Sequence, residues 1–87
     1  MKQPAYLANG IPLSLLAPGR RALVIRIDAG CGLVSRLTAM GLVPGTLVAV
    51  VSASGGPMIV SVLGSRLMLG RGMAAKVFVR ELGYSAG

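Results

Sequence analysis

The hydrophobic pattern of the chain begins with an alternation of side chains between Arg20 and Asp28, which is typical of a half-buried β-strand. Leu23, Ile25 and Ile27 fall on one face of this predicted strand. The other face holds Ala22, Val24, Arg26 and Asp28.

The period changes after the first strand. Leu33, Leu37 and Met40 recur at positions i, i+4 and i+7, which predicts one apolar stripe along a short α-helix. Gly41 suits the left-handed residue just past the end of that helix. Leu42 would then pack back on Leu37, so the sequence predicts a Schellman motif at the helix exit.

Four further strands are predicted downstream, separated by turns rich in glycine. Pro44-Gly45 favours a type II turn before the second strand, which is apolar on both faces. Gly64-Ser65 has the composition of a two-residue hairpin turn, and Gly70–Ala75 is predicted as a break. The four strands are predicted at these ranges: Thr46–Ser52, Met58–Leu63, Arg66–Leu69 and Lys76–Arg80.

These elements predict a single, mainly all-β domain. About five short antiparallel strands with one short α-helix after the first fit a small, strongly bent sheet that closes into an SH3-like β-barrel. We expect the barrel to span residues 12–82 and to open with a helical or 3₁₀ turn within Pro12–Gly19. Residues 1–11 are predicted as an N-terminal arm or added edge segment, and residues 83–87 as a C-terminal tail.

The composition argues against catalysis. The chain of 87 residues is 54% hydrophobic and contains no histidine, one cysteine and two acidic residues. No nucleophile and base can be paired from this set, so we expect a protein that is not an enzyme and that carries no cofactor. A single cysteine excludes a disulfide framework within the chain and favours a reducing, cytoplasmic location.

The hydropathy calls for a test of membrane insertion, because mean hydropathy is +0.78 and no charged residue occurs between Leu37 and Ser65. Glycine and proline residues interrupt this stretch repeatedly. A helix that spans a bilayer needs about 20 consecutive apolar residues. We therefore expect a soluble protein with an unusually apolar surface.

Five short motifs follow one another in order between Pro12 and Leu82. They are Leu13-Ser14-x-Leu16-x-Pro18-Gly19, Arg36-Leu37-x-x-Met40-Gly41-Leu42-x-Pro44-Gly45, Gly56-Pro57-x-x-Val60, Gly64-x-Arg66-x-x-Leu69 and Val77-x-Val79. In this order and spacing the chain resembles the FeoA family, small cytoplasmic proteins associated with bacterial ferrous iron uptake. The resemblance implies an SH3-like barrel and a partnership with FeoB, a membrane permease that carries a cytoplasmic GTP-binding domain. Residues 70–74 depart from the family pattern, which has an acidic, helix-favouring turn there.

Candidate iron ligands are scarce. Fe(II) prefers imidazole, carboxylate and water ligands, and the chain offers only Asp28, Cys31 and Glu81 besides weak thioethers. We therefore expect no metal site within one subunit, although an oligomer could pool ligands across an interface. Cys31 precedes the predicted helix and is expected to be an ordinary loop residue.

The surface charge indicates a negatively charged partner. The formal net charge is +7, and arginine outnumbers lysine, which favours recognition of carboxylate or phosphate groups. An acidic protein face, the anionic inner membrane leaflet and nucleic acid would all fit this charge. The alternative is that the arginine residues bind no partner and only keep an apolar protein soluble. We expect no nucleic acid, because Tyr6, Phe78 and Tyr84 are the only side chains that could stack on bases.

Apolar side chains are also expected on the outside of the barrel. Leu47–Val51 is apolar on both faces, and Met58, Met68 and Phe78 are predicted to point outward. An exposed apolar patch usually marks an interface, here with FeoB or with a second copy of the chain. The alternative is that the terminal arms cover it.

We therefore expect a small cytoplasmic accessory protein of ferrous iron transport that docks on the FeoB permease and modulates its activity. The predicted contact residues lie on the helix, its exit and nearby loops: Arg36, Met40, Leu42, Arg66 and Arg71. Supply of an arginine finger to the FeoB GTPase is one variant, and peripheral membrane contact is expected only through the partner or anionic lipid. The alternatives are a small-barrel nucleic-acid-binding protein and a module like the C-terminal barrel of metal-dependent repressors.

Overall fold

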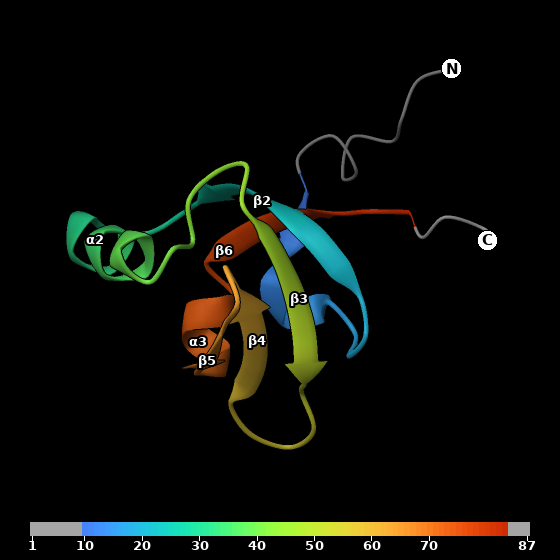
Figure 1. Cartoon of the computed structure of the whole chain (residues 1–87). Coiled ribbons are helices and arrows are strands. Elements are labelled where there is room, and N and C mark those ends of the chain that lie inside the picture. Colours follow the sequence, from blue (N-terminus) through green and yellow to red (C-terminus); the bar gives the residue numbers. More distant parts are fainter. Residues whose placement is uncertain (1–9, 84–87) are drawn as a thin grey trace.

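The computed structural model describes residues 10–83, which form one antiparallel sheet of six strands bent around a small core (Figure 1). The strand order is β1-β6-β2-β3-β4-β5, so β1 and β5 are the two edges of the sheet. This arrangement confirms the mainly β, antiparallel class predicted from the sequence. The elements in chain order are β1 (Ile11–Pro12), η1 (Leu13–Leu15), β2 (Arg21–Ile27), α2 (Cys31–Ala39), β3 (Leu47–Ser52), β4 (Met58–Val62), β5 (Ser65–Leu69), α3 (Arg71–Ala74) and β6 (Val77–Glu81).

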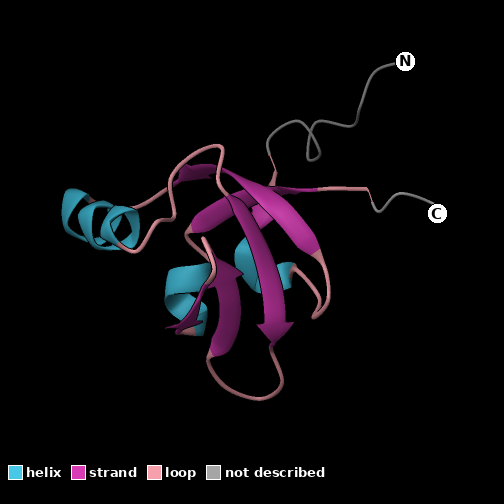
Figure 2. Cartoon of the chain, in the orientation of Figure 1, coloured by secondary structure: helices cyan, strands magenta, loops and turns pink. Residues whose placement is uncertain are grey.

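The helix α2 stands apart from the sheet, whereas η1 and α3 lie close to it (Figure 2). Leu37 is the one fully buried residue of α2, and most of its other side chains are exposed. The short helix predicted after the first strand is therefore confirmed, and the structure shows in addition that it projects from the domain. Across residues 10–83, no helix combines the length and the apolar composition that are needed to cross a lipid bilayer.

The exit of α2 is the predicted Schellman motif. The amide of Leu42 donates to the carbonyl of Leu37 at 3.0 Å, and the amide of Gly41 donates to that of Thr38 at 2.9 Å. Gly41 has a φ of +96°, the left-handed conformation that this motif requires. Leu37 and Leu42 are both completely buried, so the motif fixes the helix end to the core.

Two short elements extend the set of predicted strands and helices. Strand β1 pairs Ile11 with Val79 at an edge of the sheet, which agrees with the alternative of an added edge segment at the end of residues 1–11. Helix α3 occupies the predicted break, because Ala74 is buried and Met73 packs against the core despite poor helix propensity. Most of the predicted arm (1–9) and tail (84–87) lies outside the described residues.

The buried face of β2 differs from the face suggested by the alternation. Ala22 and Val24 are buried, while Leu23 and Ile25 are only half-buried. The register with β6 shifts between Val24 and Arg26, which indicates a β-bulge at this point. Before the bulge, Ala22 pairs with Val48 and Val24 pairs with Val79, and directly paired residues point to the same, here buried, face. After Val24 the bulge interrupts the period of two.

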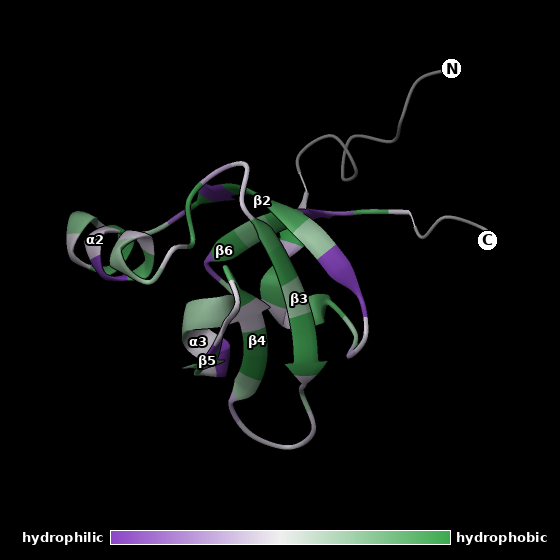
Figure 3. Cartoon of the chain, in the orientation of Figure 1, coloured by the Kyte–Doolittle hydropathy of each residue, from purple (hydrophilic) through white to green (hydrophobic). Residues whose placement is uncertain are grey.

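The core is built from the inner faces of the strands, and β3 is hydrophobic along nearly its whole length (Figure 3). Strand β4 buries Met58, Val60 and Val62, so the prediction that Met58 points outward is wrong. The physical reason is that Met58 shares its face with these two valines, whose burial fixes the alternation of the strand. Leu69 and the predicted inner pair of the last strand, Val77 and Val79, are completely buried.

The hairpin turn between β4 and β5 is shifted by one residue from its prediction. Val62 pairs with Ser65, so the two turn residues are Leu63 and Gly64. Their φ values are +52° and +81°, as expected for a type I′ turn. Leucine is an unusual first residue for this turn, because a positive φ brings its Cβ close to the backbone.

Candidate functional site

Outward-facing residues of β3 and β4, together with the turn after β4, line a groove of about 320 Å³. Its walls are formed by Leu47, Ala49, Ser61, Leu63 and Gly64, which we call the outer groove. Strand β3 buries Val48 and Val50, and its alternation therefore turns Leu47 and Ala49 outward. Ala49 is paired with Ser61 of β4, so two small side chains lie side by side between the larger leucines.

Leu63 is the most unusual residue of the outer groove. It is the one non-glycine residue with a positive φ among residues 10–83, and its side chain is 77% exposed. Left-handed backbone costs an ordinary L-residue about 1–2 kcal/mol. The sequence thus places a large apolar side chain in solvent at a position where glycine or asparagine would fit with less strain.

The hairpin turn beside the groove approaches the end of α2 at Gly41. A Cβ atom on Gly41 would lie 3.0 Å from Cδ1 of Leu63 and 3.3 Å from Cγ1 of Val62. The hairpin turn therefore rests against the helix exit with no room for a side chain. This contact joins two segments that are far apart in sequence into one surface.

A wider apolar surface surrounds the outer groove. Leu47, Val51 and Met68 are 44%, 39% and 70% exposed, and Met68 is paired with Ile59 across the β4–β5 hairpin. The expected apolar surface on β3 and at Met68 is thus confirmed. Exposed apolar surface of this kind usually marks an interaction site. Leu15, which is 70% exposed, lies instead on η1, an element that packs with β6 and α3.

Two arginine residues lie at the ends of a row that crosses the groove. Arg21 of β2 pairs with Ala49, Ala49 pairs with Ser61, and Ser61 pairs with Arg66 of β5. Both arginine residues are exposed. Within residues 10–83, neither guanidinium has a hydrogen bond or an ion pair.

Other arginine residues are engaged within the fold. The guanidinium of Arg71 donates to the backbone carbonyls of Gly56 at 3.0 Å, Ser14 at 3.4 Å and Ala53. It therefore ties the glycine-rich loop after β3 to η1 and α3. Arg20 forms an ion pair with Glu81 at 3.1 Å.

The same holds for Arg26, whose guanidinium carbon lies 4.2 Å from the ring centroid of Phe78. This distance allows a cation–π interaction. The arginine residues of the described chain thus divide into a group that stabilises the fold and a group, including Arg21 and Arg66, that faces solvent.

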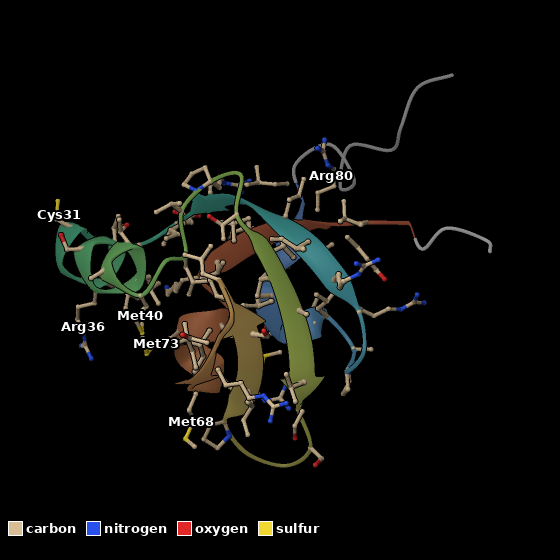
Figure 4. All side chains as sticks on the ribbon, in the orientation of Figure 1. Cys31, Arg36, Met40, Met68, Met73 and Arg80 are labelled. Atoms are coloured by element: carbon tan, nitrogen blue, oxygen red, sulfur yellow. The ribbon has the colours of Figure 1, made fainter. Side chains whose placement is uncertain are left out.

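The predicted contact residues are distributed unevenly around the outer groove. Arg66 lies at the end of the groove, while Arg36 and Met40 extend from the same side of α2 (Figure 4). Leu42 is completely buried and offers no surface to a partner; its physical role is to pack the helix exit. Arg71 is held by the loop carbonyls described above.

Sequence reasoning did not identify Ala49, Ser61 or Leu63. Ala49 and Ser61 are small and carry no chemical signature, so only the strand register reveals their position. A Leu-Gly pair between two strands was the available signal for Leu63, but Gly-Ser has the more typical hairpin composition.

Metal-binding side chains do not gather in the described part of the chain. No group of three or more histidine, cysteine, aspartate or glutamate side chains occurs within residues 10–83. Cys31 is the first residue of α2 and is an exposed free thiol.

Three comparisons with known proteins agree on one family. The FeoA domain family matches residues 11–81. A curated protein of Methanocaldococcus jannaschii, named "Putative Fe(2+) transport protein A", is 40% identical over 73 residues, which cover 84% of this chain and 89% of that protein. A crystal structure described as the iron uptake regulatory protein FeoA has a TM-score of 0.79 at 40% identity, covering 83% of this chain and 97% of the other.

The predicted SH3-like fold is confirmed by a further structure, FeoA of Stenotrophomonas maltophilia in complex with zinc, which is described as a procaryotic SH3 domain protein. Its TM-score is 0.71 at 30% identity, and the match covers 77% of this chain and 86% of that one. The family match spans all six strands and both α-helices, and two of the relatives are 40% identical to this chain. The chain belongs to the FeoA family.

Proposed function

We propose that this protein is a cytoplasmic accessory factor of ferrous iron transport that docks on the GTP-binding domain of FeoB and modulates its activity. Membership of the FeoA family and the transport-related names of the relatives support the first half of this proposal. The apolar outer face supports the second half, because a small domain with such a face is suited to binding a partner rather than to catalysis.

The main support for the proposal is the conformation and exposure of Leu63. Its backbone is strained and its side chain is exposed, so it stabilises neither the fold nor the turn as well as glycine would. An exposed leucine on a rigid turn is well suited to insert into an apolar pocket of a partner. The contact with Gly41 holds this turn in a fixed position beside the helix exit.

The test compares Leu63→Asn with Leu15→Asn in binding to the cognate FeoB GTP-binding domain, measured by calorimetry with GDP and with a GTP analogue. Asparagine tolerates a positive φ, so Leu63→Asn should keep the fold. Leu15→Asn makes the same chemical change on another exposed leucine, located on η1. We expect Leu63→Asn to weaken binding by about tenfold or more, as for an interface hot spot, and Leu15→Asn to have little effect.

Two results would count against the proposal. Undiminished binding by a folded Leu63→Asn protein would exclude the outer groove as the docking face. Failure of the wild-type chain to bind FeoB in any nucleotide state would exclude the docking function itself. Leu42→Asp is unsuitable as a probe, because a charge at this fully buried position should unfold the domain.

A role in nucleic acid binding is not favoured by any particular observation. Phe78 is the one aromatic side chain within residues 10–83, it is half-buried, and Arg26 lies over its ring. A base could stack on it only by displacing this guanidinium. We therefore retain binding to a protein partner as the proposed function.

A further inference from the structure

The row formed by Arg21, Ala49, Ser61 and Arg66 has a defined length. It crosses β2, β3, β4 and β5, which are consecutive neighbours in the sheet. Adjacent strands lie about 4.8 Å apart, so the backbones of Arg21 and Arg66 are separated by about 14 Å along the sheet. The two small residues between them leave the centre of the row open.

The chemistry of the row changes from its centre to its ends. Leu47 and Leu63 form apolar walls of the outer groove, and the hydroxyl of Ser61 is the one polar side-chain group that lines it. A guanidinium group stands at each end, where its N–H groups can donate two hydrogen bonds to a carboxylate. A complementary ligand would therefore carry an apolar group in the middle and an anionic group on each side.

An extended peptide satisfies this spacing. Extended residues advance about 3.3 Å each, so a distance of about 14 Å corresponds to residues i and i+4. Side chains at i, i+2 and i+4 of an extended chain point in the same direction. A helix would need about nine steps of 1.5 Å to cover this length, and nine steps of about 100° would turn the second anionic group to its opposite face.

We propose that the outer groove recognises an extended, acidic segment of the partner protein in which an apolar residue is flanked two positions away on each side by a carboxylate. The apolar side chain occupies the groove between Leu47 and Leu63, and the carboxylates pair with Arg21 and Arg66. A membrane surface is less well matched, because mobile lipid headgroups do not require two guanidinium groups at a fixed separation. The proposal rests on the proposed function only for the identity of the partner.

The first experiment uses a synthetic peptide and the full chain, and does not require FeoB. A peptide of sequence Glu-Thr-Leu-Thr-Glu with blocked ends is titrated against the isotope-labelled protein, and the amide signals of Ala49 and Ser61 are followed by NMR. Lys-Thr-Leu-Thr-Lys tests the charge, and Glu-Leu-Glu tests the spacing. We expect the first peptide to bind more tightly than either control by about fivefold or more, which corresponds to about 1 kcal/mol.

Three matched variants identify the responsible arginine residues. Arg21→Gln and Arg66→Gln should each weaken binding of the acidic peptide by about tenfold, the loss typical of a hydrogen bond to a charged group. Arg80→Gln makes the same change in net charge on β6, where Arg80 pairs with Leu23 of β2 and so lies outside the row of Arg21, Ala49, Ser61 and Arg66; Figure 4 labels Arg80. This control should bind as the wild type does.

The possible outcomes separate this proposal from the proposed function. If the protein bound the three peptides with equal affinity, the proposed recognition of two carboxylates would be overturned even if FeoB binds. The same would follow if the three arginine variants bound the acidic peptide with equal affinity. A second result would overturn the proposal in favour of a lipid surface. In it, phosphatidylglycerol vesicles shift the amide signals of Ala49 and Ser61, Arg21→Gln and Arg66→Gln abolish this shift, and none of the peptides binds. A wild-type chain that binds the acidic peptide but not FeoB would leave the groove chemistry supported and the proposed partner wrong.

Discussion

At the scale of single residues, the contact between Gly41 and Leu63 sets the shape of the outer groove. Gly41 combines a φ of +96° with a hairpin turn that leaves no space for a Cβ atom. The nearest atom is the end of a flexible leucine side chain, whereas Val62 behind it belongs to the buried core. Both the conformation and the packing therefore require glycine.

We expect Gly41→Ala to destabilise the domain by about 1–2 kcal/mol through its backbone conformation, with a further cost from displacing Leu63 and Val62. Gly55→Ala is the matched control, because Gly55 also has a positive φ of +73° but nothing lies near its missing Cβ. Chemical denaturation of the two variants measures the difference. Equal losses of stability would show that the packing against the hairpin turn contributes nothing.

Leu63 shows why part of the site escapes prediction from sequence. Its alternation with Ser61 and its position before Gly64 are visible in the sequence, but the φ of +52° is not. Typical turn composition instead favours Gly64-Ser65, one residue later. Only the pairing of Val62 with Ser65 settles which residues form the turn.

At the scale of elements, Arg71 holds together segments that sequence analysis treats separately. Its guanidinium connects α3 to the loop between β3 and β4 and to η1. The loop contains Gly55-Gly56 and has little hydrophobic anchoring of its own. Its conformation should therefore depend on this single side chain.

We expect Arg71→Gln to speed amide hydrogen exchange in residues 53–57 and to lower the unfolding free energy by about 1 kcal/mol. Arg36→Gln removes the same charge from the exposed surface of α2, where no bond within residues 10–83 depends on it, and serves as the control. Unchanged exchange in the loop would show that the carbonyl contacts do not restrain it. The readout is exchange measured by NMR on the full chain.

The elements themselves differ in how far sequence could predict them. Helix α2 and its exit follow from the spacing of Leu37, Gly41 and Leu42, because a helical period and a Schellman motif are local signals. The bulge in β2 and the helix α3 depend on tertiary packing instead. Ala74 is buried by its surroundings, and nothing in the sequence Gly70-Arg71-Gly72 indicates a helix.

At the scale of the whole molecule, the sequence predicted the apolar surface on β3 and at Met68, but not which arginine residues lie beside it. The net charge of +7 treats all arginine residues alike. The structure separates them, since Arg71 binds backbone carbonyls while Arg21 and Arg66 are left at the ends of the outer groove. This separation arises from strand register, which composition cannot reveal.

The edge position of β5 has one more consequence. An unpaired strand edge can recruit the same edge of another copy, and a charged side chain on such a strand opposes this aggregation. Arg66 is the one charged residue of β5, where it stands beside the exposed Met68, so it should act as a gatekeeper residue. Neutralising it would then favour edge-to-edge assembly, and a partner that covers it would also shield the edge.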